Sequence, residues 1–595
     1  MMVDHDAHFD ADVLVVGLGP MGGTTALALA QYGVRVHAIS RQPWLADTPR
    51  AHIMNLRAAE VLRSLGVEER LQEQATPWES IGDTLFTTSL VGPEVFRMRT
   101  WGTGDDRHRD YLRSSPATML DIPQTLVEPI LVNAAAGHGA KISFNTEYIS
   151  SVQDAEGVTV SLRDRLNGIE YEQRVRYLVG ADGARSRVMD SAGLTVEGEL
   201  GRAGHVYAQF RGDLSQYVAH RPSVLNFIVN PEVAVGEIGF GLLRAVKPWD
   251  TWIAGWGFDM TKGDPDVSRE TALARIRAYV GDPDFEPEIT SIAPWYVNEA
   301  SAPVYSNGRI FCGGDATHRH PPSSGLGSNT CIQDAFNLAW KLAFVVQGDA
   351  DPVLLESYTA ERAPVGKQIV ARANQSRRDY AAIHEALKPS YEGGPSGPAR
   401  LKAQDADGAA ARAALAAAID LKQYEFNAQG IEMNQRYESN AVIPDAHGAP
   451  EIWKRDRDLY VQATTRPGAK VPHAWLVGAD GHRISTLDIV GGPFLTLLIS
   501  PSGVVWAEAV EAVANPRLRT ITIGEPGADD LYYEWHRVRE VDDRGAVLVR
   551  PDGVVAWRAL TAPTDAADAR RQLEDVLARL LGMPVLAETP AESPA

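Results

Sequence analysis

The chain has 595 residues, of which 44% are apolar and 23% charged, and its net charge is −20. This length predicts two or three domains, and the acidic charge disfavours nucleic acid or an anionic membrane as a partner. The two cysteines, Cys312 and Cys331, cannot form a disulfide framework or a CxxC metal site, which fits a reducing compartment. The N-terminus does not resemble a signal peptide and no apolar run approaches the roughly 18–20 residues of a membrane span, so we expect a cytoplasmic protein. Because no CxxC motif is present, we also expect no metal site.

A dinucleotide fingerprint follows the first predicted strand. The β-branched run Val13–Val16 leads into GLGPMG at residues 17–22, an Ala- and Leu-rich helix, and a second strand over Val34–Ile39. In this context the first glycine makes a tight turn, the second admits a pyrophosphate, and the third lets the helix pack on the strand. A serine and an arginine stand where an acidic ribose ligand is expected. The candidate cofactor residues here are Gly17, Gly19, Pro20, Gly22, Ser40 and Arg41.

Two further stretches precede predicted helices. PRAHIMNLR, residues 49–57, contains Arg50, His52 and Arg57. These side chains could neutralise a pyrophosphate, face a reaction centre, or simply form a solvated helix start. The second stretch runs from Asp121 to Gln124 and opens a helix; its aspartate could be a functional base or a helix N-terminal acceptor.

The middle of the chain changes character after a third glycine-bearing strand end, Asp182-Gly183. Short β-rich runs separated by Pro, Asp, Asn and Lys predict a meander-like antiparallel sheet with one face over a cofactor. The predicted strands are His205–Phe210, Val224–Val229, Gly236–Leu243 and Trp252–Gly257. Arg244 follows the third run and could hold dinucleotide phosphates transiently or lie at the solvated surface.

The stretch from Gly308 to Ala343 predicts a second ligand-binding turn. A strand over Arg309–Cys312 ends at Gly313-Gly314-Asp315, where a carboxylate could accept hydrogen bonds from sugar-like hydroxyls. A glycine loop then feeds a helix over Ile332–Val346, for which Asn329 and Thr330 are the expected N-caps. The loop residues expected near a ligand are Asp315, Pro322, Gly325, Gly327, Ser328 and Asn329.

The C-terminal third predicts helices, a linker and a separate small domain. Helices dominate from Gly348 to Asn434, with a surface helix over Gly408–Ala418, and Tyr460–Lys470 is a plausible linker. The following βαβ…ββα order predicts a thioredoxin-like domain, which without CxxC cannot perform disulfide chemistry. Its predicted elements are strands Phe494–Ile499, Leu518–Ile523, Ala546–Val549 and Val554–Trp557 and helices Trp506–Val513 and Ala566–Leu581.

These elements predict an α/β and α+β protein, with a Rossmann-type FAD-binding domain, an inserted antiparallel substrate-binding sheet and a C-terminal thioredoxin-like domain. The expected boundaries are 1–200 and 301–400 for the two parts of the FAD-binding domain, 201–300 for the substrate sheet, 401–465 for a helical connection, 466–583 for the thioredoxin-like domain, and 584–595 for a disordered tail.

The motifs, taken in order, resemble those of the single-component FAD-dependent aromatic hydroxylases, in the phenol 2-monooxygenase branch. The resemblance rests on four sequence motifs: PRAHIMNLR, DIPQTLVEPI, GGDATHRHPPSSGLGSN and ERAPVGKQIVARAN. The resemblance implies bound FAD, contacted by the residues named above together with Gln124 and Asp182. The chain departs from the usual pattern at Ser40, at Met189, and at Ser323, Ser324 and Leu326 of the proline loop.

The resemblance also implies a reaction. NADH or NADPH reduces FAD, O₂ adds to give a flavin hydroperoxide, and one oxygen atom passes to the carbon ortho to a phenol hydroxyl. His52 and Asp121 are the hypothesised bases that remove the phenol proton. A homodimer or higher homo-oligomer is also implied. Three alternatives stay open: tailoring of a larger aromatic polyketide, sequestration of an aromatic compound without hydroxylation, and reduction of double bonds.

Overall fold

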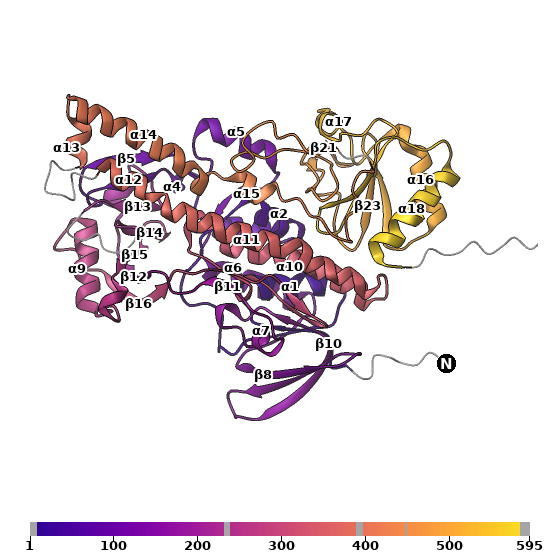
Figure 1. Ribbon diagram of the computed structural model, residues 1–595, viewed down its shortest axis with the longest axis horizontal. Helices are drawn as coiled ribbons and strands as arrows, with labels where there is room; N and C mark the ends of the chain where they lie inside the picture. Colours follow the sequence, from indigo (N-terminus) through magenta and orange to yellow (C-terminus); the bar gives the residue numbers. More distant parts are fainter. Residues whose placement is uncertain (1–8, 231–237, 388–396, 447–448, 584–595) are drawn as a thin grey trace, which may run out of the picture.

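The computed structural model describes residues 9–230, 238–387, 397–446 and 449–583. The polar N-terminal segment before residue 9, the start of the predicted strand Gly236–Leu243 and the predicted disordered tail lie outside these residues. In Figure 1 the C-terminal domain lies at one end of the molecule and the strands β12–β16 at the other, with the long helices α10 and α11 between them. No helix in the described ranges combines the length and apolar character that crossing a bilayer requires.

The FAD-binding domain is built on an eight-stranded sheet, in which β18-β19-β10-β1-β2-β7 are neighbours and β8 and β9 extend from β10. Strands β19, β10, β1, β2 and β7 run parallel. Register places Val16, Gly180 and Cys312 side by side, so the three glycine-bearing strand ends meet at one edge of the sheet. The strands are β1 Ala11–Val16, β2 Val36–Ile39, β7 Lys141–Ser143, β8 Thr146–Gln153, β9 Val158–Asp164, β10 Glu170–Gly180, β18 Ser306–Asn307 and β19 Ile310–Cys312.

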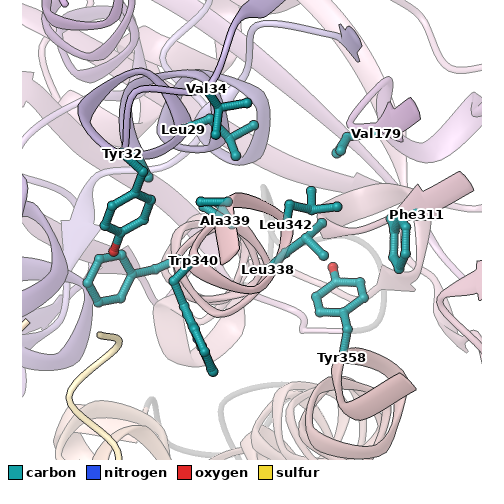
Figure 2. Packing of buried hydrophobic residues seen from close by; sticks show 14 of the residues in the cluster. Leu29, Tyr32, Val34, Val179, Phe311, Leu338, Ala339, Trp340, Leu342 and Tyr358 are labelled. Carbon is teal, nitrogen blue, oxygen red and sulfur yellow. The ribbon is translucent and has the colours of Figure 1, made fainter. Parts of the chain in front are cut away.

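Helices α1 (Pro20–Gln31) and α10 (Gly327–Val346) pack against each other in the core of this domain. Figure 2 shows Leu29, Tyr32 and Val34 on the side of α10 from which Leu338, Ala339 and Leu342 extend, whereas the Trp340 ring points away from them. Full burial of each large apolar side chain contributes about 1.5–3 kcal/mol. The two helices that follow the glycine motifs therefore share one core, and their N-termini are held in fixed relation.

A seven-stranded sheet of order β16-β12-β15-β14-β13-β4-β5 forms the substrate domain. Strands β4 and β5 come from residues 84–98, which the sequence had assigned to the FAD-binding domain, and β13 pairs with β4 in parallel. The sheet is therefore mixed, because a distant segment adds to its edge. The strands are β4 Thr84–Thr87, β5 Glu94–Met98, β12 Gly204–Arg211, β13 Leu225–Ile228, β14 Gly241–Lys247, β15 Thr251–Phe258 and β16 Glu288–Tyr296.

Short strands and helices connect the two sheets. β3 (Ile53–Met54) and β6 (Leu120–Asp121) form a two-stranded ribbon. α14 (Ala406–Phe426), predicted as a surface helix, buries Leu415 and Ala418 against α12 (Tyr380–Leu387). The remaining elements are β11 Glu197–Glu199, β17 Glu299–Ser301, β20 His318–Arg319, α2 Leu56–Ser64, α3 Glu68–Gln74, α4 Trp78–Ile81, α5 Asp105–Ser114, α6 Gln124–Gly137, α7 Arg187–Ser191, α8 Ser215–Val218, α9 Arg269–Val280, α11 Ser357–Arg378, α13 Gly397–Lys402 and α15 Gln429–Met433.

The C-terminal domain has the predicted thioredoxin-like order. Its sheet runs β24-β23-β25-β26, with β23 and β24 parallel and the other pairs antiparallel. Helices α16 and α18 pack against each other, and a hairpin of β21 and β22 precedes the sheet. The elements are β21 Trp475–Val477, β22 Arg483–Ser485, β23 Leu495–Ile499, β24 Leu518–Thr522, β25 Ala546–Val549, β26 Val555–Ala559, α16 Val504–Val513, α17 Glu534–Val538 and α18 Ala566–Leu581.

Candidate active site

One cavity of about 1640 Å³ lies between the carboxyl edge of the FAD-domain sheet and the face of the substrate sheet. Its volume exceeds the roughly 300–1,000 Å³ typical of a pocket for one small ligand, so it can hold a cofactor together with a substrate. Most of the predicted cofactor residues line it: Gly17, Gly19, Pro20, Ser40, Arg41, Arg50, Gln124, Asp182, Asp315, Pro322, Gly325, Gly327 and Ser328. In the described part of the chain its walls do not include Gly22, Arg57, Asp121 or Asn329.

The turn between β1 and α1 has the shape that a dinucleotide requires. Gly17 has φ of +105°, and a Cβ there would overlap the Ala181 carbonyl. A Cβ on Gly22 would overlap the Gly17 carbonyl, so this glycine serves packing. The space beside Gly19 is open, since its nearest neighbour would be Glu128 Oε1 at 3.7 Å. No side chain caps α1, and its first N–H groups are available to an anion such as a pyrophosphate.

The second strand end offers no carboxylate of its own. Ser40 Oγ accepts a hydrogen bond from the Gln42 N–H at 3.2 Å. A buried acid that the sequence had not singled out, Glu128 on α6, lines this part of the cavity. Glu128 accepts from the Gln124 amide at 2.5 Å and from the Ala46 N–H at 2.7 Å. Burial raises the pKa of Glu128, and these hydrogen bonds oppose that rise.

Asp182 lies at the cavity wall but uses its carboxylate locally. It accepts hydrogen bonds from the Ser186 hydroxyl at 2.5 Å and from the Arg187 N–H at 2.8 Å. These bonds hold the turn that begins α7. Met189, one of the departures from the usual pattern, is buried in the core at 3% exposure and is not part of the described cavity wall.

The proline loop brings Asp315 and the N-terminus of α10 to the same cavity. Gly325 adopts φ of +61° and Ser324 φ of +68°. The helix begins at Gly327 without a side-chain cap, so the prediction that Asn329 caps it is wrong, and Asn329 is not among the described residues of the cavity wall. Asn329 instead accepts from the Asn55 N–H at 2.9 Å and donates to the Ile53 carbonyl at 2.8 Å. It joins the loop to the ribbon.

The ribbon brings the two predicted bases together. Ile53 pairs with Asp121 in the β3–β6 register, and the Ile122 N–H donates to the His52 carbonyl at 2.7 Å. His52 lines the cavity, whereas Asp121 lies behind the wall with 1% of its surface exposed. The prediction that Asp121 acts directly as a base is therefore wrong, because a second side chain lies between Asp121 and the cavity.

That side chain is Arg244, which lines the cavity floor. Its guanidinium forms an ion pair with Asp121 and donates to the Val224 carbonyl at 2.9 Å. With 7% of its surface exposed, Arg244 is neither a solvated surface residue nor a mobile phosphate ligand, and both earlier readings are corrected. Burial raises the pKa of Asp121, and Arg244 opposes that rise; Asp121 Oδ2 has no hydrogen-bond partner in the described chain.

His52 is a buried imidazole with an available nitrogen. Burial, with a smaller contribution from Arg244, holds the pKa of His52 well below its usual 6.5. The ring is therefore neutral near pH 7, and a neutral imidazole has one nitrogen that can accept a proton. Its Nε2 is buried without a hydrogen-bond partner among the described residues.

Arg57, predicted to contact the cofactor, points the other way. It donates to the Asp552 carbonyl of the C-terminal domain at 2.8 Å and pairs with Glu60 at 3.1 Å.

The sequence also missed most of the cavity floor. Every second residue on five strands of the sheet points toward the cavity. This alternation identifies the lining residues only when it is known which face of the sheet borders the cavity. They include Leu225, Phe227, Leu242, Ile253, Tyr207, Gln209, Ser291, Ala293 and Trp295, with Trp101, Tyr380 and Phe426 closing the sides.

Comparisons with known proteins agree with this geometry. A family model described as an FAD binding domain matches residues 10–373, and one described as aromatic-ring hydroxylase, C-terminal, matches residues 464–584. The chain is 46% identical over 582 residues to 2,4-dichlorophenol 6-monooxygenase of Cupriavidus pinatubonensis, with 96% of each chain covered. It is 42% identical over 578 residues to phenol 2-monooxygenase of a Pseudomonas strain, covering 96% of this chain and 92% of the relative.

A solved structure shows the same architecture. The flavin-dependent monooxygenase PieE, in complex with FAD and substrate, has a TM-score of 0.90 and 40% identity to this chain. The match covers 96% of this chain and 99% of that one.

Proposed function

The chain belongs to the FAD-dependent aromatic-ring hydroxylases, and from this we propose that it hydroxylates a phenol ortho to its hydroxyl group, using NADH or NADPH and O₂. When bound, FAD would take electrons from NAD(P)H and activate O₂, which supplies the transferred oxygen atom while its second atom leaves as water. The protein binds and orients the two ligands and excludes water. The observation that carries the proposal is the buried, unpartnered Nε2 of His52 in the cavity that also contains the Gly19 turn.

The fit of FAD rests on the cradle itself. Two helices without side-chain caps, α1 and α10, start at the cavity wall, so their N–H groups favour the pyrophosphate. Asp315 and the buried Glu128 line the cavity and would accept hydrogen bonds from hydroxyl groups of the ribityl chain or ribose. Arg41 and Arg50 line the same region and offset the phosphate charges.

His52 accepts the phenol proton at one ring nitrogen. A phenol of pKa about 10 is almost wholly protonated near pH 7, and the ring becomes much more nucleophilic as that proton leaves. Arg244 beside His52 stabilises the negative charge that develops on the phenol oxygen, and Asp121 holds the guanidinium in place. Asp121 is thus a positioning residue. A positioned base contributes roughly 10²- to 10⁴-fold to such a step.

The first test asks whether the FAD-loaded chain consumes NAD(P)H in the presence of a phenol and yields a product heavier by one oxygen atom. Oxidation of NAD(P)H that releases only hydrogen peroxide with every phenol tried would favour an aromatic-binding or sequestering protein. Reduction of a double bond without oxygen transfer would favour a reductase.

The second test assigns the base. We expect His52→Ala to retain FAD, to form product about 10²- to 10⁴-fold more slowly, to release more peroxide, and to recover partly at high pH, where the phenol ionises unaided. His482→Ala, in an exposed turn of the C-terminal domain, is the matched control. Full coupling in His52→Ala at pH 7 would remove the histidine from the mechanism. A homo-oligomer and a cytoplasmic location stay predictions, and light scattering of the intact chain tests the first.

A further inference from the structure

A second polar group lies at the far end of the cavity floor from Arg244. His205 on β12 and Trp295 on β16 are paired across the strands, and their rings stack with centroids 4.8 Å apart and planes 23° apart. Both line the cavity. His205 is 7% exposed. We name this pair, with Arg377 behind it, the distal polar group.

Each ring carries one N–H donor. The Arg377 guanidinium donates to His205 Nε2; because Nε2 accepts, a neutral imidazole must carry its proton on Nδ1. Burial and the nearby Arg377 lower the pKa of His205 to about 3, so the ring is neutral near pH 7. The hydrogen bond from Arg377 is made at His205 Nε2, and the Trp295 indole N–H is buried without a partner among the described residues.

Such donors point to a ligand. Most buried polar groups in proteins are hydrogen-bonded, and leaving one unpaired costs about 1–3 kcal/mol. Two neutral N–H donors beside a guanidinium are complementary to an oxygen acceptor such as a carbonyl, an amide oxygen or a carboxylate. They do not complement a cation or an aliphatic group.

Sheet register shows that this acceptor is distant from the reacting phenol. Arg244 pairs with Ile253 on β15, whereas His205 pairs with Gly257 on the same strand. The two residues are therefore two strands and four residues apart, which is about 10 Å across and about 13 Å along the sheet, or roughly 16 Å between backbones. A single phenol ring does not span that separation.

The floor between the two ends is apolar and continuous. Tyr207, Leu242 and Gly255 occupy it, and a Cβ on Gly255 would lie 2.8 Å from the Tyr207 ring. The missing side chain lets the tyrosine lie flat across the sheet. This surface suits a second ring or an alkyl chain that connects a phenol to an acceptor.

On the premise of the proposed hydroxylase function, we propose that the natural substrate is an extended aromatic compound whose phenol ring lies by His52 and Arg244 and whose remote oxygen acceptor is bound by His205 and Trp295. The distal polar group is then a specificity-determining site that selects substrates larger than a simple phenol.

The test uses pairs of 4-alkylphenols of graded chain length, one ending in a carboxamide and the other in an isopropyl group of similar shape. Dissociation constants for the FAD-loaded protein are measured from the change in flavin absorbance. At the chain length that spans the floor, we expect the carboxamide to bind at least about 10-fold more tightly. Trp295→Phe, which keeps the ring and removes the N–H, should cancel most of that preference while leaving the isopropyl compound unaffected.

The control is Trp256→Phe, on β15 but in the core behind the floor, which should keep the preference. Equal affinity within every pair for the wild-type protein would overturn the inference, as would an undiminished preference in Trp295→Phe. A raised KM for NAD(P)H in Trp295→Phe, with the preference intact, would assign the donors to the dinucleotide and also overturn it. Failure of the hydroxylase proposal is separate: product mass from the whole series of 4-alkylphenols, with either terminal group, reports on that function, because a hydroxylase adds one oxygen atom to some member of the series whether or not the carboxamides bind more tightly.

Discussion

Two buried arginine–carboxylate pairs in different parts of the molecule differ in how completely they are hydrogen-bonded. Arg550 of the C-terminal domain binds Glu361 on α11 through two bonds of 2.6 and 2.9 Å. Lys341 and Asn337 on α10 also donate to Glu361, at 2.8 and 2.6 Å. The Asp121–Arg244 pair, by contrast, borders the cavity, and one Asp121 oxygen has no partner in the described chain.

The difference appears in the acidity of the two carboxyls. Burial alone would raise the pKa of Glu361, but Arg550 and Lys341 hold it well below its usual range. For Asp121 the effect of burial exceeds the opposing effect of Arg244, and the pKa is raised. A saturated network therefore fixes charge and structure, whereas the incompletely paired group next to a ligand cavity retains a charge distribution that a substrate can change.

A second buried group of hydrogen bonds, centred on Asp334, reaches the cofactor loop. Asp334 on α10 accepts from Arg362 at 2.7 Å, from His318 at 3.0 Å and from the Gly314 N–H at 3.1 Å. Gly314 precedes Asp315 in the cavity wall. Arg550 and Asp552 of the C-terminal domain bind Glu361 on α11 and Asn337 on α10, and α10 is the helix that follows the loop.

The largest effect is expected from breaking the saturated pair. Arg550→Met should lower the free energy of unfolding by about 3–5 kcal/mol, because Glu361 and Asp552 lose their main counter-charge in a dry interior. Urea unfolding measures this. The control is Arg455→Met. The Arg455 side chain, which pairs with Asp110, is 53% exposed, so this substitution should lower the free energy of unfolding by only about 0–1 kcal/mol. Equal losses in the two variants would contradict the assigned role of burial.

Breaking the cavity pair should affect catalysis more than stability. We expect Asp121→Asn to reduce the rate of product formation about 10- to 100-fold, equivalent to about 1.4–2.8 kcal/mol of barrier, because Arg244 loses the carboxylate that orients it. Product and hydrogen peroxide per NAD(P)H consumed are the readouts. An Asp121→Asn protein that unfolds far more easily, yet stays fully coupled while folded, would make this pair merely structural.

The two carboxyls should affect stability with opposite dependence on pH. A carboxyl with a depressed folded pKa contributes stability that is lost as the pH falls below its unfolded value, 4.5 for Glu361. A carboxyl with a raised folded pKa, Asp121, loses stability as the pH rises above 3.8 toward that raised value. Each slope is at most about 1.4 kcal/mol per pH unit.

Unfolding free energies of Glu361→Gln and Asp121→Asn, measured across this acidic range, separate the two contributions. Glu361→Gln should reduce the loss of unfolding free energy as the pH falls below 4.5. Asp121→Asn should remove the loss of unfolding free energy as the pH rises above 3.8. Slopes of the same sign in both variants would show that the two environments do not differ as described.

The smallest effect concerns His52. Because its pKa lies well below 6.5, the rate of product formation should change less than about twofold through ionisation of this histidine between pH 6 and 7.5. Stopped-flow or product assays across that range measure it. An acidic limb centred near pH 6.5 that disappears in His52→Gln would show that the ring is not neutral in the working enzyme.

Local patterns in the sequence predicted a large part of this protein. The strand–GLGPMG–helix turn is confirmed, as are helix Ala566–Leu581 and the strand Ala546–Val549, at the same residues. These features depend on spacing within one element, on the glycine φ that a tight turn needs, and on apolar periodicity. All of these act over a few residues and can be read directly from the sequence.

Only the tertiary structure decided which distant residues share a site. The ribbon that sets Ile53 against Asp121, the ion pair of that aspartate with Arg244, and the stacking of His205 on Trp295 all join segments about 70 to 120 residues apart. Strand alternation allows such side chains to face a cavity, but the choice of partner strand depends on packing of the whole sheet. For the same reason Asn329 and Arg57, plausible ligands by position, lie in contacts with other parts of the fold.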